Sequence, residues 1–165
     1  MENVINNYAI YDSPIGKLYI EAENNSIVAI DYMHDTYEFE SRSCLITDMA
    51  AAQLNEYFAG RRKKFDFPYK LKGTVFQKKV WKELMEIPYG ETRSYKQIAE
   101  AIGNPKACRA VGMANNHNPI IIAVPCHRVI GSNGNLTGFR CGMDIKQKLL
   151  KIEGINLYNY NNKSV

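Results

Sequence analysis

The spacing of apolar residues changes near residue 72, and no other feature of this 165-residue sequence constrains its fold more. Before that point apolar and polar residues alternate over short runs, which is typical of β-strands. The runs expected to form strands are 8–11, 17–22 and 27–32. After that point apolar residues recur at helical spacing, so we expect an α+β protein with a sheet-containing domain over 1–72 and a helical domain over 73–165.

One helix is also expected in the first domain. Thr47 or Asp48 can cap its beginning, and Gly60 can end it. The apolar residues expected to be buried by this helix are Met49, Leu54 and Phe58. The first domain is therefore predicted to pack a helix against a small sheet.

Capping boxes mark two helices of the second domain. Thr74 is followed three residues later by Gln77, and Ser94 by Gln97. In this motif the hydroxyl accepts a hydrogen bond from the backbone of the third residue, whose side chain bonds back. Trp81 lies on the apolar stripe of the first helix and is expected in the core.

A turn at Gly103 separates the second capped helix from a third, which is expected to begin at Asn104-Pro105 and to run to about Ala114. Two short helices joined by such a turn have the outline of a helix-turn-helix, whose second helix contacts DNA. Small side chains would let this helix lie close to a duplex, although they also allow tight packing between helices. Its small and basic residues are Lys106, Ala107, Arg109, Ala110, Gly112 and Ala114.

The net charge of +4 is unevenly distributed. Residues 1–72 contain 8 Lys or Arg and 11 Asp or Glu, a balance of −3, whereas residues 73–165 contain 13 and 6, a balance of +7. A polyanionic partner would therefore bind the second half, and a solvated basic face is the plainer alternative.

The cysteines argue against a disulfide scaffold and against a metal site. There are four, none in a CxxC pair, and the three histidines have no ligand spacing. No apolar run approaches the roughly 18–20 residues that cross a bilayer. We expect a cytoplasmic protein with free thiols, no membrane contact, and neither metal nor cofactor.

A thiol follows the most apolar segment of the chain. The segment 120–124 is expected to be a buried strand that leads into Pro125 and Cys126. A cysteine in apolar surroundings is inert unless a base or a positive charge favours its thiolate, and His127 and Arg128 are adjacent. Glu153 is a candidate carboxylate to orient the imidazole. A cysteine that serves only as a small buried hydrophobe remains the alternative.

The run Pro125-Cys126-His127-Arg128-Val129 resembles the active-site signature of the O6-alkylguanine-DNA alkyltransferases. Further similarities to that family extend in register over about 80 residues of the second half, with a looser likeness in the first half. They occur at 74–81, 87–92, 94–99, 104–112, 118–119, 149–150 and 153–154.

The resemblance implies direct-reversal DNA repair by a suicide methyltransferase. A methyl or small alkyl group on O6 of guanine, and on O4 of thymine as a further substrate, would pass from duplex DNA to Cys126 in a single turnover. The damaged nucleotide would be flipped out of the helix. The implied fold is an RNase H-like first domain and a winged-helix-like second domain, in a monomer without an obligate protein partner.

The resemblance also implies catalytic roles. Cys126 would accept the alkyl group, His127 would activate it through a bridging water, and Glu153 would orient His127. Asn118 would hold the turn before the active-site segment and hydrogen-bond near the thiol. Tyr95 would donate a proton to the departing guanine and lie near the DNA backbone.

Other roles concern DNA and the substrate pocket. Arg109 would enter the base stack in place of the flipped nucleotide, while Lys106 and Arg128 would support structure or attract the backbone. Ala107 and Ala110 would allow close approach to DNA. The residues expected to line the pocket are Val129, Phe139, Arg140 and Cys141, with Cys141 standing where the family usually has glycine.

Three rival functions are compatible with parts of this pattern. An alkyltransferase-like damage sensor would lack the acceptor cysteine, which is present here. A cysteine hydrolase would turn over repeatedly. A DNA-binding regulator would use Cys126 only for packing, and its binding would survive replacement of that residue. The carboxy-terminal segment 156–165 is rich in Asn and Tyr and is expected to be frayed.

Overall fold

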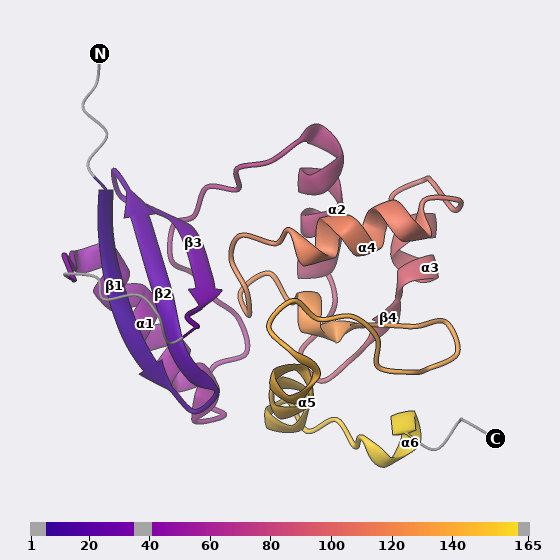
Figure 1. The fold of residues 1–165 in the computed structure, drawn as a ribbon. Helices are drawn as coiled ribbons and strands as arrows, with labels where there is room; N and C mark the ends of the chain where they lie inside the picture. Colours follow the sequence, from indigo (N-terminus) through magenta and orange to yellow (C-terminus); the bar gives the residue numbers. More distant parts are fainter. Residues whose placement is uncertain (1–5, 35–40, 162–165) are drawn as a thin grey trace. The chain divides into compact units, whose positions relative to one another are not determined.

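The computed structural model describes residues 6–34 and 41–161, and they form an α+β protein as expected (Figure 1). The chain divides into two compact units. The first contains residues 1–72 together with Pro119–Ile121, and the second contains residues 73–118 and 122–165.

The first unit is built on an antiparallel sheet of three strands, β1 (Asn6–Ser13), β2 (Gly16–Glu23) and β3 (Ser26–Tyr32), in that order. Residues on one face of β2 are buried at every second position, as alternation predicts. A bulge between Glu21 and Ala22 shifts the register to β3. The three predicted strands are confirmed, and each is one or more residues longer than its alternating run.

Helix α1 (Leu45–Phe58) packs on this sheet (Figure 1). Ile46, Ala50, Leu54 and Tyr57 are buried at helical spacing, while Met49 is 46% exposed, so the prediction that Met49 is buried is wrong. The helix begins at Leu45 rather than after Thr47, with Cys44 as its N-cap. Thr47 is the third residue of the helix, and its hydroxyl accepts a hydrogen bond from the Cys44 N–H at 2.9 Å.

The segment 120–124 is not the continuous strand that its apolar run predicts. Only its beginning pairs with the sheet of the first unit, where the Ile121 N–H donates to the Ile30 carbonyl at 2.9 Å. At Ile122 the backbone turns with φ of +73°, which is strained for a β-branched residue. The Asn118 side chain donates to the Val124 carbonyl at 2.7 Å and so closes the turn. A side-chain hydrogen bond has replaced strand pairing here.

The second unit contains mostly helices, joined by a two-stranded parallel sheet. Its elements are α2 (Val75–Met85), β4 (Arg93–Ser94), α3 (Tyr95–Ala101), α4 (Cys108–Asn116), the 3₁₀ turn η1 (Cys126–Arg128), β5 (Val129–Ile130), α5 (Met143–Ile152) and α6 (Tyr158–Asn161). Helix α2 packs against α3 and α4, and α3 packs against α4. The helix-turn-helix pair therefore rests on a third helix.

Both predicted capping boxes are present, at Thr74–Gln77 on α2 and at Ser94–Gln97 on α3. Trp81 is buried as expected, and its indole N–H donates to the Ala114 carbonyl at 2.8 Å. This bond fixes α2 against the end of α4.

The prediction that the third helix starts at Asn104 is wrong. Residues 104–107 form a turn, closed by the Ala107 N–H on the Asn104 carbonyl at 3.0 Å, and α4 begins only at Cys108. Asn104 and Pro105 are favourable at a helix start, but Asn and Pro are also among the residues that dominate turns. Lys106 and Ala107 consequently lie before the helix rather than within it.

The carboxy-terminal segment is more ordered than its composition predicts. Ile155 and Leu157 pack with Leu150 in an apolar cluster, against which Leu136 and Tyr160 also lie. The Tyr160 hydroxyl is 3.3 Å from the Thr92 hydroxyl. The expectation of a frayed end is thus wrong for residues 156–161, and residues 162–165 lie outside the described part of the chain.

Candidate active site

Cys126 begins the 3₁₀ turn η1, directly before β5. Strand β5 pairs with β4, so that Arg93 faces Val129 and Ser94 faces Ile130. Because Ser94 is the N-cap of α3, this pairing brings the first residue of that helix, Tyr95, toward η1, which is called the active-site turn. The short sheet of β4 and β5 thereby joins two motifs that are about 30 residues apart in the sequence.

The Cys126 thiol is enclosed, since the residue is only 2% exposed, but several of its neighbours are polar. Burial raises the pKa of this thiol. A hydrogen bond from Asn118 and the positive charges of Lys146 and Arg140 act in the opposite direction. The surroundings are therefore not the purely apolar ones that would make a cysteine inert.

His127 and Glu153 form the pair that the sequence suggested. The His127 Nε2 lies 2.6 Å from a Glu153 carboxylate oxygen, and the imidazole is completely buried. Burial lowers the pKa of His127, so the ring is neutral at neutral pH. With its Nε2–H donated to Glu153, the ring has its basic lone pair on Nδ1. That atom is buried and makes no hydrogen bond to the described residues.

Glu153 is ionised despite its burial. Burial alone would raise its pKa, but the hydrogen bonds and charges of His127 and Arg128 hold the pKa well below its usual range. The Gly90 N–H also donates to this carboxylate at 3.2 Å. Glu153 follows the last residue of α5, so this helix delivers the carboxylate to the site.

Arg128 does not lie where a DNA-backbone contact would need it. The residue is 6% exposed, and its guanidinium donates twice to Glu153, at 2.8 and 3.0 Å, and once to the Ile87 carbonyl at 2.7 Å. We therefore correct the expectation of a DNA contact, while the structural role suggested for this residue agrees with its place. A bidentate pair of this kind neutralises the Glu153 charge inside the unit.

Tyr95 is half-buried beside the segment that follows the active-site turn. Its hydroxyl lies 3.4 Å from the carbonyls of Thr137 and Gly138, a long distance for hydrogen bonds. Burial raises the pKa of this phenol, so the hydroxyl keeps its proton at neutral pH. A neutral hydroxyl with such weak partners can donate to another acceptor.

Two asparagines hold the turn around Cys126. Asn118 was expected there, and it bonds Val124 as described above. Asn115, on the buried side of α4, donates to the Cys126 carbonyl at 3.3 Å. Both amides fix the backbone on either side of Pro125, and hence the direction of the Cys126 side chain.

The exposed side of α4 carries the residues predicted to meet DNA. Arg109 and Ala110 are exposed, and Lys106 is exposed in the turn before the helix, whereas Ala107 is half-buried. Among the described residues Arg109 forms no ion pair or hydrogen bond. Met113, one helical turn beyond Arg109, is 64% exposed on the same face. Ala114 is buried, so only some of the small residues lie on the exposed face of this helix.

The predicted pocket residues follow the active-site turn. Val129 is buried in β5, Phe139 is half-buried, and Cys141 is 9% exposed. The Arg140 guanidinium donates to the Asn118 carbonyl at 3.1 Å, and this ties the segment back to the turn. Val129, Arg140 and Cys141 thus belong to the same unit, and the first two connect directly to the turn around Cys126.

Sequence reasoning missed three residues of this region, namely Met113, Asn115 and Lys146. Met113 and Asn115 lie within α4, but helical spacing alone does not show which faces are covered. Lys146 is fully buried between Ile145 and Leu149 on α5. The signal that could have identified it is a lysine within the apolar stripe of a short helix.

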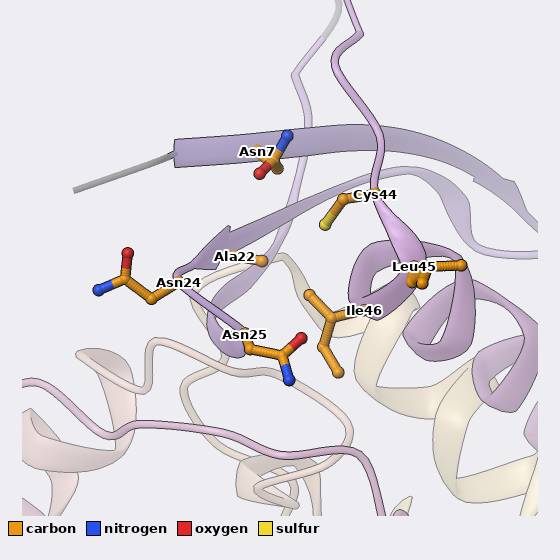
Figure 2. A pocket seen from close by; sticks show the side chains of 7 residues that line it. All are labelled: Asn7, Ala22, Asn24, Asn25, Cys44, Leu45 and Ile46. Atoms are coloured by element: carbon orange, nitrogen blue, oxygen red, sulfur yellow. The ribbon is translucent and has the colours of Figure 1, made fainter. Parts of the chain in front are cut away.

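A pocket of about 370 Å³ lies elsewhere, in the first unit (Figure 2). It lies between the β2–β3 turn and the start of α1, and it is lined by Asn7, Ala22, Asn24, Asn25, Cys44, Leu45 and Ile46. Its polar groups are amides and one thiol. This pocket therefore lacks the acids and bases found around Cys126.

Within residues 6–34 and 41–161, no group of three or more His, Cys, Asp or Glu side chains could hold a metal ion. In that same part of the chain, no helix is long and apolar enough to span a bilayer.

Two family models match the chain. The ribonuclease-like domain of 6-O-methylguanine DNA methyltransferase matches residues 6–71, and the DNA-binding domain of the same family matches residues 75–155. These matches agree with the order of the two units, a sheet-containing one followed by a helical one.

Relatives match over almost their whole length. A methylated-DNA–protein-cysteine methyltransferase of Methanosarcina acetivorans is 51% identical over 152 residues, which are 89% of this chain and 97% of the relative. One of Mycobacterium bovis is 50% identical over 151 residues, 88% of this chain and 91% of the relative.

Solved structures agree as well. The O6-methylguanine methyltransferase of Mycobacterium tuberculosis has a TM-score of 0.83 at 47% identity, covering 90% of this chain and 93% of that one. The same organism's enzyme, called OGT, in complex with DNA has a TM-score of 0.82 at 48% identity, with 89% and 92% covered. The chain therefore belongs to the 6-O-methylguanine DNA methyltransferase family.

Proposed function

We propose that this protein repairs DNA by moving a methyl or small alkyl group from O6 of guanine to Cys126. The observation that carries the proposal is the buried cluster formed by His127, Arg128 and Glu153, the first two of which follow Cys126 directly in the chain. A neutral His127 is oriented by an ionised Glu153, and Arg128 holds that carboxylate. Relatives named methylated-DNA–protein-cysteine methyltransferases, and a similar structure in complex with DNA, support the same activity.

The chemistry follows from the state of each group. The thiol proton passes to Nδ1 of His127, through a bridging water, and Glu153 stabilises the imidazolium that forms. The thiolate then attacks the alkyl carbon. A sulfur–carbon bond forms as the carbon–O6 bond breaks, and the electron pair stays on guanine.

Guanine leaves more easily if it receives a proton as it departs. Tyr95 is suited to donate one because its hydroxyl is protonated and only weakly engaged. The thioether product is stable, so each molecule acts once. These steps require neither a metal nor a cofactor.

Access to the alkyl group requires the nucleotide to leave the stack, at a cost of a few kcal/mol. Arg109 is the residue we assign to the vacated space, since it is exposed and has no intramolecular partner among the described residues. Ala110 and Ala107 allow close approach, and Lys106 adds attraction to the backbone. The partner is therefore double-stranded DNA that carries O6-alkylguanine.

Three further points are part of the proposal. The functional domains are 1–72 and 73–165, with the chemistry in the second, although Pro119–Ile121 packs with the first unit. The pocket is formed by Val129, Phe139, Arg140 and Cys141. The protein acts as a monomer in the cytoplasm, and O4-alkylthymine is a second substrate to test.

The decisive experiment is a stoichiometric transfer assay. Duplex DNA containing one O6-methylguanine is incubated with the full chain, and intact and peptide mass spectrometry follow. We expect one CH₂ mass increment, on Cys126 only, and no further turnover. Repeated release of product would indicate a cysteine hydrolase. Binding without any mass change would indicate a damage sensor or a DNA-binding regulator.

A further inference from the structure

The proposed chemistry leaves the carboxy-terminal segment 155–161 without a role. Residues 156–161 lie beyond the range 75–155 that the family model of the DNA-binding domain matches. Their composition predicted a frayed end, yet the segment is folded onto the second unit. A short polar segment stays ordered only where its contacts offset the loss of conformational entropy, so these contacts need an explanation.

Backbone hydrogen bonds turn the segment back toward α5. The Ile155 N–H donates to the Leu150 carbonyl at 3.0 Å, and the Tyr160 N–H donates to the Leu157 carbonyl at 3.0 Å. The side chains of Ile155 and Leu157 are buried and pack with Leu150 in one apolar cluster. The segment thus has its own apolar anchor on α5.

Two contacts of this segment involve other parts of the second unit. Leu136, in the stretch after β5, packs against the apolar cluster, as does the Tyr160 ring. The Thr92 hydroxyl, directly before β4, lies 3.3 Å from the Tyr160 hydroxyl. The carboxy-terminal segment therefore contacts two stretches that are about 40 residues apart in the sequence.

Both stretches lead to Tyr95. Thr92 stands three residues before it, with only the two residues of β4 between them. Leu136 directly precedes Thr137, whose carbonyl lies 3.4 Å from the Tyr95 hydroxyl. The segment 155–161 is therefore in contact with the chain beside the Tyr95 backbone and with the chain beside the Tyr95 hydroxyl. A shift of either stretch would move the phenol that we assign as proton donor.

The direct contacts between Tyr95 and these stretches are weak. Its hydroxyl is 3.4 Å from the Thr137 and Gly138 carbonyls, and the sheet beside its backbone has only two residue pairs. The Lys146 ammonium of α5 donates to the Val129 and Thr137 carbonyls, at 2.6 and 2.9 Å. The position of the phenol thus depends on how firmly the neighbouring stretches are held.

The two tyrosines of α6 differ in their surroundings. Tyr158 is 73% exposed, whereas Tyr160 is half-buried against the apolar cluster and Thr92. Cover for the apolar cluster requires only the ring of Tyr160. Its hydroxyl adds a contact with the stretch that leads into Tyr95.

We propose that the segment 155–161 positions Tyr95 for alkyl transfer, with Tyr160 as its positioning residue. Tyr160 exchanges no proton with the substrate. The proton that guanine receives still comes from Tyr95, and the thiol proton still passes to His127. The role in transfer rests on the proposed function, while the effect on the position of Tyr95 does not.

A segment that only covers the apolar cluster is the alternative, and substitutions in α6 separate it from the proposal. Tyr160→Ala removes both the ring and the hydroxyl. Tyr160→Phe keeps the ring and removes only the contact with Thr92. The matched control is Tyr158→Ala, which changes the exposed tyrosine of the same helix.

The first measurement places a single fluorine on Tyr95. Fluorotyrosine is incorporated at this position alone in the full chain, and its fluorine NMR resonance reports the surroundings of the ring in the absence of DNA. We expect Tyr160→Ala to move the resonance toward its position in the unfolded chain. Tyr160→Phe should move it less, in the same direction, and Tyr158→Ala should leave it unchanged.

The second measurement is single-turnover methyl transfer from duplex DNA at saturating concentration. A positioned general acid contributes roughly 10²–10⁴-fold to a rate, so its partial displacement in Tyr160→Ala should slow transfer about tenfold. Tyr160→Phe should slow transfer about twofold, as expected for one weak hydrogen bond. DNA affinity should not change, because Tyr160 lies outside α4, and Tyr158→Ala should match the wild type.

A double-mutant cycle with Tyr95→Phe separates positioning from a general loss of structure. Tyr95→Phe has no phenolic proton to donate, so adding Tyr160→Ala to it should slow transfer by less than about twofold. Thermal unfolding checks that each variant is folded at the assay temperature. An equal tenfold loss in both backgrounds would mean that the segment does not act through Tyr95, and the proposal would be overturned.

Slow transfer by Tyr160→Ala with an unmoved fluorine resonance also overturns the positioning role. If Tyr160→Ala does not fold, Tyr160→Phe decides, and a resonance and a rate identical to those of the wild type overturn the proposal. If the wild type transfers no methyl group but the fluorine resonance still moves, the proposed function fails and the effect of the segment on Tyr95 stands.

Discussion

Two arginines of the second unit, Arg109 and Arg128, have opposite surroundings. Arg128 is buried, and its guanidinium donates hydrogen bonds to Glu153 and to the Ile87 carbonyl, so that it holds Glu153. Arg109 is exposed on α4 and has no intramolecular partner among the described residues. In the buried cluster around η1, formed by His127, Arg128 and Glu153, the charged groups bind one another and so set one another's protonation states. On the exposed face of α4, the charge of Arg109 can interact with a partner molecule.

This contrast separates chemistry from binding. Substitutions in the buried cluster should change the rate of transfer and the stability of the fold. Substitutions on the exposed face of α4 should change interaction with DNA and leave stability unaltered.

Cys126→Ala should abolish transfer completely, because it removes the sulfur that forms the new bond to the alkyl carbon. DNA binding should persist, since the exposed face of α4 is unaltered. Mass spectrometry measures the first effect, and fluorescence anisotropy with labelled duplex measures the second. A mass increment on Cys141 in this variant would show that the acceptor has been misassigned.

Glu153→Gln removes the carboxylate that faces Arg128 and His127. Breaking a buried pair leaves an uncompensated charge, so the free energy of unfolding should fall by about 3–5 kcal/mol. Transfer should also slow, because the imidazolium loses its stabilising partner. Urea unfolding and single-turnover kinetics measure the two effects. A fully stable variant with normal kinetics would remove Glu153 from the chemistry.

The buried cluster should also make stability depend on pH in a defined direction. His127 has a folded pKa below its ordinary 6.5, and Glu153 one below its ordinary 4.5. In both cases the unfolded chain binds the proton first, so stability is fully present above these values and is lost as pH falls. The loss from His127 should reach about 1.4 kcal/mol per pH unit below 6.5.

Urea unfolding at a series of pH values, on the wild type and on His127→Asn, tests this dependence. The variant should lack the part of the loss that begins near pH 6.5. Identical curves for the two proteins would mean that His127 is not buried in its neutral form.

Arg109→Ala should weaken repair in duplex DNA by roughly five- to thirtyfold, because it removes about 1–2 kcal/mol of compensation for the unstacked base. Transfer from the free alkylated base should be unaffected, since that base needs no flipping. Both rates are measured in parallel, together with thermal unfolding. Equal losses on the two substrates would argue against a role in flipping.

Lys106→Ala should have the smallest effect, a decrease in DNA affinity of a few fold, uniform across sequences. The slope of log affinity against log salt should decrease in magnitude by about one. Binding titrations at several salt concentrations measure this slope. A changed rate of transfer at saturating DNA would show that Lys106 also affects the chemical step, which the separation of binding from chemistry assigns to the buried cluster alone.

Local patterns were sufficient for much of the fold. The capping boxes at Thr74 and Ser94 and the alternation in the first three strands predicted elements correctly, because these signals depend on neighbours within a few residues. The prediction was poorer where a local pattern fits two structures. Asn104-Pro105 opens a turn instead of a helix, and the apolar run 120–124 bends at Ile122.

The contiguous motif around Cys126 was enough to indicate a candidate acceptor cysteine, a neighbouring candidate base and the likeness to one family. Which charges are buried could be known only from the tertiary fold. Arg128 and Arg109 look alike in sequence, and Lys146 looks like any lysine of a helix. These residues differ in their distances to Glu153, to solvent and to the Val129 and Thr137 carbonyls. Electrostatic effects depend on separation in space and on burial, and neither is a local property of the chain.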